Sequence, residues 1–187
     1  MPDQILSSET VFRGWFDVLM LQVRLASGEE IERPIVEHPS GAAVLPYDPE
    51  RRVALLITEA RPPVLLSGES RIVEVIAGAL DEDDPESCAR REACEEGGLN
   101  LKILEHVAHL WQTPATSTER VDYFLAPYSE RDRVAAGGGL DEESEHIRVK
   151  EIALADLWRM AEERTLRDAK TLILLQALRI RRPDLFS

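Results

Sequence analysis

One short segment constrains this chain more than any other, because the sequence fixes both ends of a helix within it. Asp84 can cap a helix, and Pro85 suits the first helical position because it lacks an amide hydrogen. Gly97-Gly98 then ends the helix, since glycine readily takes the left-handed conformation that follows a last turn. The sequence therefore predicts a helix from residue 84 to about residue 96.

Three glutamates share one face of this predicted helix. Glu92, Glu95 and Glu96 stand at positions i, i+3 and i+4, which are neighbours on a helix surface. Because like charges repel, such a face needs either full solvation or a cation among its carboxylates. Carboxylate oxygens in this arrangement suit Mg²⁺, with Mn²⁺ as the alternative. From the spacing alone, a solvated glutamate face is the commoner explanation, because such faces are frequent on surface helices.

Short apolar strands surround this helix in the sequence. They indicate an α/β fold in which a mixed sheet is flanked by helices, two of them closing the chain at residues 154–163 and 167–181. The predicted strands are residues 42–45, 53–57, 72–76, 99–107, 121–125 and 147–152.

The N-terminal segment forms a predicted appendage to this fold. Residues 11–36 are interpreted as two strands joined by a turn at Ser27-Gly28, with Trp15 and Phe16 inside the first strand. This strand carries apolar side chains on both faces, whereas a solvated hairpin keeps one face polar. We therefore expect residues 1–38 to be a hairpin that joins two copies of the chain, and residues 39–187 to be the main domain.

Composition excludes several classes of protein. The 187 residues carry 22 Lys and Arg against 35 Asp and Glu, a net charge of −13, which argues against nucleic acid as a partner. No apolar run is long enough to span a membrane, and the first residues lack the features of a signal peptide. Cys88 and Cys94 point apart on the predicted helix and cannot form a disulfide, which is typical of a cytoplasmic protein.

The segment from Ala77 to Leu99 resembles the signature box of the Nudix hydrolases. Residues 91–99 match the second half of that box, Arg-Glu-apolar-X-Glu-Glu-X-Gly-apolar, at every specified place. The first half departs from it, because Asp84 stands in place of a glutamate and the following spacer is one residue short. Asp84 is thus either the equivalent of that glutamate or only a helix cap. A short box also resembles the GDP-mannose pyrophosphatase branch of the family.

The resemblance implies a Nudix-like α/β/α sandwich with a mixed sheet, and a metal site around the glutamates. Glu92 and Glu96 match the ligands that bridge metals in the family, and the backbone carbonyl of Ala77 matches a further ligand. Glu95 shares their face as a ligand or an orienting group, and Arg91 holds the glutamates in place. Such enzymes use bound divalent metals to activate water for attack on a diphosphate.

An acidic stretch near the C-terminal third matches the loop that supplies a catalytic base in the ADP-ribose pyrophosphatase branch. In the best alignment Glu143 is the base and Glu145 is an extra metal ligand, with Glu142 one register away. Residues 137–139 are three consecutive glycines, which we expect to give this loop the mobility of a lid.

The resemblance also implies the contacts with substrate. Arg61 occupies the place of an arginine that meets the diphosphate, although Glu59-Ala60 replaces the usual Gln-X before it. Glu119 resembles the glutamate of a turn that contacts the terminal sugar. Arg33 and Trp15 match residues that reach the substrate of the partner subunit in a homodimer.

These features predict a Mg²⁺-dependent hydrolase that cleaves the diphosphate of a nucleoside diphosphate sugar. The N-terminal residues 9–16 and 41–49 resemble the ADP-ribose branch, so that ADP-ribose is the favoured substrate, yielding AMP and ribose 5-phosphate. The short box and the glycine run favour GDP-mannose instead. A Nudix-fold binding or regulatory module with little turnover is the alternative from another class.

Overall fold

The computed structural model describes residues 1–80, 84–139 and 146–187, and these residues form two compact units. The first unit contains residues 1–40 and 110–121, and the second contains residues 41–109 and 122–187. The expected N-terminal segment, residues 1–38, thus falls in the first unit together with a segment from the middle of the chain.

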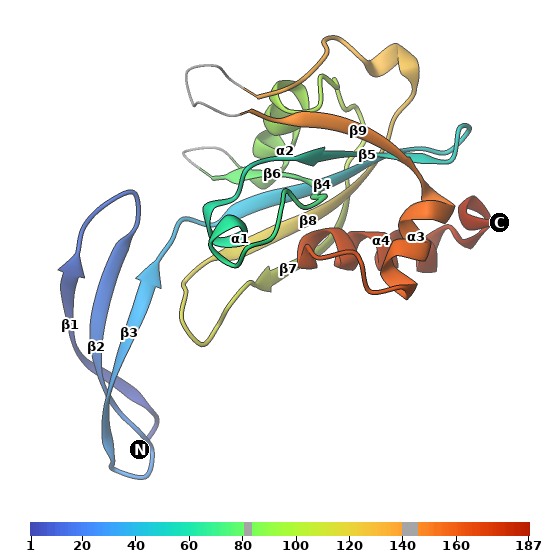
Figure 1. Ribbon diagram of the computed structural model, residues 1–187. Coiled ribbons are helices and arrows are strands. Elements are labelled where there is room, and N and C mark those ends of the chain that lie inside the picture. The colour runs from blue at the N-terminus through green and yellow to red at the C-terminus, as the bar shows by residue number, and fades with distance from the viewer. Residues whose placement is uncertain (81–83, 140–145) are drawn as a thin grey trace. The chain divides into compact units, whose positions relative to one another are not determined.

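The first unit is built on a three-stranded antiparallel sheet with the order β1-β2-β3 (Figure 1). Residues 110–121 attach to its last strand, because the Val36 amide donates to the Thr116 carbonyl (2.7 Å) and the Val36 carbonyl accepts from the Thr118 amide (3.0 Å). The strands are β1 (Gln4–Phe12), β2 (Asp17–Arg24) and β3 (Glu30–Glu37).

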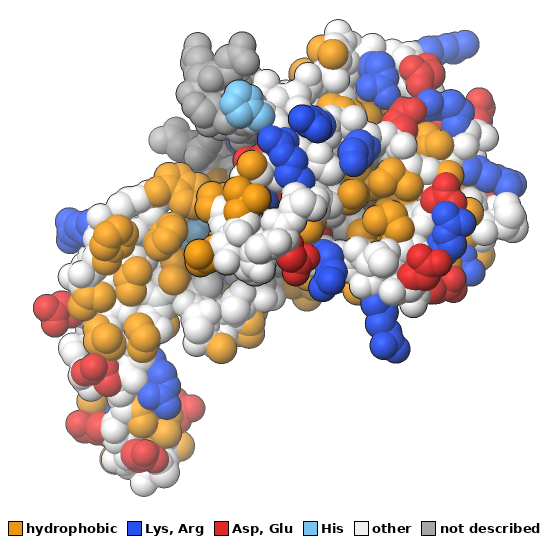
Figure 2. All heavy atoms as spheres, viewed as in Figure 1, with side chains coloured by type: hydrophobic (Ala, Val, Ile, Leu, Met, Phe, Trp, Pro, Cys, Tyr) orange, Lys and Arg blue, Asp and Glu red, His pale blue; other side chains and the backbone are white. Residues whose placement is uncertain are grey.

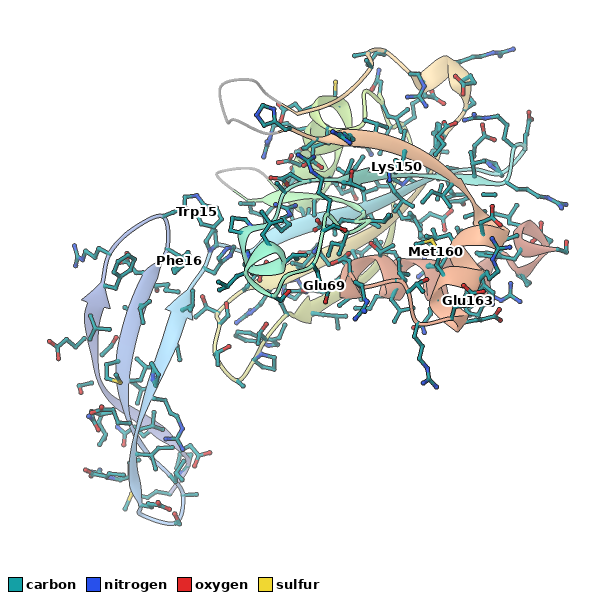
Figure 3. The ribbon with its side chains drawn as sticks, in the orientation of Figure 1. Trp15, Phe16, Glu69, Lys150, Met160 and Glu163 are labelled. Carbon is teal, nitrogen blue, oxygen red and sulfur yellow. The ribbon has the colours of Figure 1, made fainter. Side chains whose placement is uncertain are left out.

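The expected two-stranded hairpin is therefore a three-stranded sheet. The missed strand, β1, is an edge strand with a polar centre of Ser7, Ser8, Glu9 and Thr10, so its sequence carries no apolar alternation. Its conformation comes instead from pairing with β2. Trp15 and Phe16 were expected inside a strand, but they lie in the connection between β1 and β2 (Figure 3).

The second unit is organised around a six-stranded mixed sheet with the order β7-β8-β4-β5-β9, in which β6 pairs with β4. Residues 41–44 of β4 pair with β6, whereas Tyr47 and Asp48 pair with β5. The strands are β4 (Gly41–Asp48), β5 (Val53–Thr58), β6 (Ile76–Ala79), β7 (Glu105–Trp111), β8 (Arg120–Pro127) and β9 (Arg148–Ala153).

Helices cover both faces of this sheet, which confirms the predicted sandwich. Figure 1 shows α2 on one face and α4 on the other, and both helices contact the central strand β4. All eight residues of β4 are consequently buried. The α-helices are α1 (Pro62–Leu66), α2 (Pro85–Glu95), α3 (Leu154–Glu162) and α4 (Ala169–Arg181), and the 3₁₀ helices are η1 (Glu130–Asp132) and η3 (Pro183–Phe186).

Among the described residues, every helix is too short or too polar to cross a membrane.

Candidate active site

Helix α2 carries the predicted glutamates, and its first turn is fixed by local hydrogen bonds. The Asp84 carboxylate accepts from the amides of Glu86 (3.0 Å) and Ser87 (3.2 Å), and also from the Ser87 hydroxyl (2.7 Å). The bond from the Ser87 side chain holds the pKa of Asp84 below its ordinary value. Asp84 is therefore a helix cap, as one of the two sequence interpretations proposed.

The three glutamates differ in how deeply they lie. The Glu96 residue is 3% exposed, whereas the side chains of Glu92 and Glu95 are 12% and 29% exposed. Glu92 lies against the backbone of β6, because a Cβ atom built on Gly78 would stand 1.8 Å from the Glu92 Oε1 atom. Only glycine at position 78 leaves room for the Glu92 carboxylate. This carboxylate therefore lies beside the backbone of Gly78, the residue that follows Ala77.

Arg91 connects Glu92 and Glu95 to each other and to the end of β6. One guanidinium nitrogen, Nη1, lies 2.8 Å from Glu92 Oε1 and 3.3 Å from Glu95 Oε2. The other, Nη2, donates to the Ala79 carbonyl at 3.4 Å. The guanidinium places one positive charge among these carboxylates and ties the helix to the end of β6.

The buried thiol of Cys88 contacts the same turn of backbone. Its sulfur donates to the Ala79 carbonyl at 3.4 Å. Both cysteines are free thiols, Cys88 buried and Cys94 exposed, which confirms that they form no disulfide with each other.

Arg61 lies in a second group of carboxylates in the same unit. Its Nη1 atom is 2.8 Å from Glu59, and its Nε atom is 3.2 Å from Glu74, which is only 4% exposed. Burial alone would lower the pKa of Arg61, but Glu74 and Glu59 outweigh it and hold the pKa above its ordinary value. The charge of Glu96, at the end of α2, contributes in the same direction.

Glu74 is a residue that the sequence analysis missed. It stands alone in the apolar stretch 72–76, and its backbone pairs with Ile57 on β5 through two hydrogen bonds of 2.9 Å. An acidic residue in an otherwise apolar run is the signal that could have marked it, because a buried carboxylate needs a charged partner.

The donor set of α2 and β6 fits a hard divalent cation. Among the described residues, no three His, Cys, Asp or Glu side chains are grouped as a complete metal site. Magnesium, however, is usually held by one or two carboxylates together with water and substrate phosphates. Glu92 and Glu96 supply carboxylates, and the close approach of Glu92 to Gly78 brings it near the backbone that contains the Ala77 carbonyl.

The other predicted site residues lie elsewhere in the chain. Trp15, Arg33 and Glu119 belong to the first unit. Trp15 is 80% exposed there, and its ring stands edge to face with that of His38, with the ring centres 5.3 Å apart. Glu143 and Glu145 lie outside the described residues.

The glycine run before that acidic segment has a role that was not foreseen. Residues 137–139 were expected to provide mobility, but they pack against the end of α2. The Gly138 amide donates to the Glu96 carbonyl at 2.9 Å, and the Gly139 amide donates to the Glu95 carbonyl at 3.2 Å.

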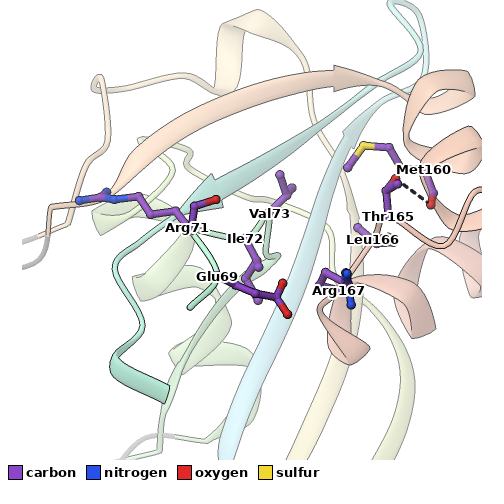
Figure 4. Close-up of a pocket in the computed structure, with 9 residues that line it drawn as sticks. Glu69, Arg71, Ile72, Val73, Met160, Thr165, Leu166 and Arg167 are labelled. Carbon is purple, nitrogen blue, oxygen red and sulfur yellow. Dashed lines mark hydrogen bonds between the residues drawn. The ribbon is translucent and has the colours of Figure 1, made fainter. Parts of the chain in front are cut away.

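A cavity of about 360 Å³ lies apart from these residues in the second unit (Figure 4). It is lined by residues 69–73, by Met160 of α3 and by residues 165–167 of the connection between α3 and α4. Of the predicted site residues that the structure describes, none borders it.

Comparison with known proteins agrees with the fold and the sequence motif. Residues 37–175 match the family described as NUDIX domain. A GDP-mannose pyrophosphatase of Cronobacter sakazakii is 36% identical over 152 residues, covering 80% of this chain and 78% of that protein. One of Klebsiella pneumoniae is 31% identical over 180 residues, covering 93% and 90%. The chain therefore belongs to the Nudix family.

A solved structure shows the same fold. The crystal structure of an ADP compounds hydrolase has a TM-score of 0.75 against this chain at 20% sequence identity, covering 97% of each.

Proposed function

We propose that this protein hydrolyses the diphosphate linkage of a nucleoside diphosphate sugar with the help of a divalent metal, Mg²⁺ or Mn²⁺. The observation that carries the proposal is the glutamate face of α2. Glu92 is pressed against the backbone at Gly78, Glu96 is nearly buried, and Arg91 lies between Glu92 and Glu95. A binding module has no need for carboxylates that are held together in this way.

We assign the following roles to the residues of this chain. Glu92, Glu96 and the Ala77 carbonyl would hold the metal, with Glu145 as a further ligand and Glu95 as a ligand or an orienting group. When bound, the metal supplies charge neutralisation of the diphosphate and a lowered pKa for the attacking water. Arg91 keeps the carboxylates in position, because it contacts both Glu92 and Glu95.

Glu143 is the proposed base that accepts the proton of the attacking water. The bond from the Gly139 amide to the Glu95 carbonyl supports this role, because it fixes the chain beside α2 four residues before Glu143. Glu142 is the alternative base, one register away.

Arg61 is the proposed contact of the diphosphate. Its Nε and Nη1 atoms are held by Glu74 and Glu59, and this fixes the plane of the guanidinium. A planar fork that is held in place binds phosphate oxygens with defined geometry.

Two observations bear on the preferred sugar nucleotide. The N-terminal resemblance favours ADP-ribose, which would be cleaved to AMP and ribose 5-phosphate. GDP-mannose is the second candidate, because relatives of 31% and 36% identity that carry this name match most of the chain. Both substrates fit the same chemistry, so the choice between them depends on contacts to the base and sugar.

A substrate screen tests the proposal. The protein is incubated with ADP-ribose, GDP-mannose and other nucleotide sugars in Mg²⁺ or Mn²⁺, and phosphate is measured after a coupled phosphatase removes it from the products. We expect turnover of at least one, with ADP-ribose and GDP-mannose compared by kcat/KM. The Glu92→Gln variant, purified in parallel, controls for contaminating phosphatases. Activity that is absent, or equal in both preparations, would favour the binding-module alternative.

We also propose a homodimer that forms through the first unit. In this dimer Arg33 and Trp15 of one subunit contact the substrate bound to the other subunit. Glu119 contacts the terminal sugar of the substrate. The apolar side chains of β1 and the following turn support it. Ile5, Val11, Phe12 and Trp15 are each more than half exposed, and Figure 2 shows hydrophobic side chains grouped over this unit. Covering them in an obligate dimer would bury upward of ~2,000 Å².

Sedimentation and subunit mixing test the dimer. Deleting residues 1–38 should abolish both the dimer and the activity. If Arg33 acts across the interface, mixing inactive Glu92→Gln with inactive Arg33→Ala subunits regains activity, because the mixed dimer contains one complete site. A full-length monomer at micromolar concentration with normal turnover would contradict this proposal.

The two free thiols support a reducing compartment, and we propose the cytoplasm as the location of the protein.

A further inference from the structure

The end of α2 is closed by hydrogen bonds that come from a distant segment. The carbonyls of residues 92, 93 and 94 accept from the amides of residues 96, 99 and 98, respectively. The next two carbonyls, those of Glu95 and Glu96, accept from Gly139 and Gly138. These are carbonyls that a helix end otherwise leaves to water, because no further turn supplies donors.

The approach of the two segments is closer than a side chain would permit. A Cβ atom built on Gly137 would stand 2.3 Å from the Glu96 carbonyl oxygen, and one on Gly98 would stand 2.2 Å from the Ala135 carbonyl oxygen. Both glycines also have positive φ angles, +71° at Gly137 and +67° at Gly98. The contact therefore depends on glycine both for space and for backbone conformation.

The contact between the glycine run and the end of α2 fixes the backbone of Glu95 and Glu96, which carry two carboxylates of the proposed site. Val134 and Ala135 extend it, because both amides donate to the Gly98 carbonyl, at 2.8 and 3.3 Å. The last turn of a helix frays readily when its carbonyls face only water. Glu95 and Glu96 stand in that last turn, and small displacements of ligands strongly weaken a metal site.

We propose that Gly137–Gly139 acts as a positioning element for Glu95 and Glu96, holding the end of α2 so that these carboxylates are prearranged for the divalent cation. We call this segment the glycine clamp. Its glycines touch neither substrate nor metal, and they act through the main chain of the two glutamates. The inference deepens the proposed function, because it rests on the metal site proposed there.

The test compares two glycines that share a backbone conformation and differ in their surroundings. Gly68 has a φ of +80°, close to that of Gly137, but a Cβ atom there meets nothing within 4 Å. Gly68→Ala therefore reproduces the conformational strain without disturbing α2. Gly137→Ala adds the collision with the Glu96 carbonyl. Binding of Mn²⁺ to each folded protein is measured by electron paramagnetic resonance, and kcat and KM are measured at saturating metal.

We expect Gly137→Ala to weaken Mn²⁺ binding at least tenfold and to lower kcat with little change in KM, whereas Gly68→Ala stays within twofold of the wild type in each. A purely structural role would lower the melting temperature of both variants and leave the Mn²⁺ affinity of the folded protein unchanged. Wild-type affinity in folded Gly137→Ala would overturn the proposal.

Hydrogen exchange of the wild-type protein keeps the inference testable if Gly137→Ala does not fold. The amides of Gly138 and Gly139 should be protected, and Mn²⁺ should increase their protection. Exchange as fast as in an unstructured peptide, or protection that Mn²⁺ leaves unchanged, would reject the clamp. Because metal binding is read without substrate, failure of the clamp is distinguishable from a failure to hydrolyse nucleotide sugars.

Discussion

The second unit contains two clusters of arginine and carboxylate groups, which differ in the ratio of positive to negative charges. The first, which we call the site cluster, contains Arg61 and Arg91 with the carboxylates of Glu59, Glu74, Glu92, Glu95 and Glu96. The second, the strand-end network, contains Arg51 and Arg133 with the carboxylates of Asp48, Glu130 and Glu151.

The strand-end network is nearly neutral and densely bonded. Arg51 lies 2.7 Å from Asp48 and 2.8 Å from both Glu130 and Glu151, and Arg133 lies 2.7 Å from Glu151. The Tyr128 hydroxyl also donates to Glu151 at 2.8 Å. The hydrogen bond from Arg51 is the main reason that the pKa of Glu151 falls to about 2.

The site cluster has the same number of guanidinium groups but more carboxylates. Counting only the described residues named above, two arginines accompany five carboxylates there, against three in the strand-end network. The formal excess of negative charge is three rather than one when all carboxylates are ionised. Such an excess destabilises a fold unless a cation relieves it. We infer that balance between the charges serves stability, whereas the excess is kept for binding.

Removing a charge from the site cluster should have the largest effect on activity and a small one on stability. Glu92→Gln and Glu96→Gln should each lower kcat at least ~10²-fold, because each removes a carboxylate that would position the metal. We expect Tm to change by no more than about 3 °C, since like-charge repulsion falls at the same time. Steady-state kinetics and thermal unfolding measure both.

Glu86→Gln is the matched control for these variants. Glu86 lies on the same helix, but it faces Arg90 at 3.5 Å rather than the site cluster. Its kcat should remain within about twofold of the wild type. Near-normal turnover of Glu92→Gln or Glu96→Gln at saturating Mg²⁺ would show that the excess charge is not a metal site.

Glu143 tests whether the acidic loop belongs functionally to the site cluster. Glu143→Gln should reduce kcat by roughly 10- to 100-fold with a smaller change in KM, because a base acts in the transition state. Glu142→Gln and Glu145→Gln are measured beside it. If one of these is the severe variant instead, the assignment of the base moves to that residue.

The sequence predicted the parts of the site whose signals are local. The cap at Asp84, the glycine stop and the spacing of Glu92, Glu95 and Glu96 all lie within one helix, so their geometry follows from helix periodicity. Arg91 contacts residues one and four positions further along the same helix, at distances that a helix surface provides.

Features that depend on contacts between distant segments were not predictable in this way. Strand β1 is polar and exists because β2 pairs with it. Glu74 has no periodic signal, and its partner Arg61 lies beyond an intervening helix. The bond between Gly138 and Glu96 joins segments far apart in the chain, so three glycines indicated a flexible loop where the structure has a close contact.

Arg61 is intermediate between a residue that stabilises the fold and one that binds a ligand. Its charge is paired with carboxylates, as in the strand-end network, and yet we propose that it binds substrate. Arg61→Lys should raise KM about tenfold, since lysine lacks the planar fork that two carboxylates hold in place. Glu74→Gln should raise KM by a smaller factor, roughly threefold, because Glu59 still holds one edge of the guanidinium. An unchanged KM in both variants would assign Arg61 to the fold rather than to the substrate.

The strand-end network should show the opposite pattern, with an effect on stability alone. Glu151→Gln should leave kcat within about twofold of the wild type. It should lower the free energy of unfolding at pH 7 by roughly 2 kcal/mol, and Tm by about 4–8 °C, after allowance for the partial exposure of Glu151. Glu50→Gln, an exposed residue beside Arg51, serves as the control and should change Tm little.

The pH dependence of this effect has a definite sign. The pKa of Glu151 is lowered on folding, from its ordinary 4.5 to about 2, so its contribution to stability is fully present above pH 4.5. It is lost as the pH falls through this range toward 2, because the folded protein must then take up a proton that breaks the contacts with Arg51 and Arg133. The difference in Tm between wild type and Glu151→Gln should therefore be constant from pH 5 to 7, within about 1 °C, and should shrink steadily in more acidic buffers. A difference that persists unchanged at pH 3 would mean that Glu151 acts through its shape rather than its charge, and the contrast between the two clusters would then lose its electrostatic basis.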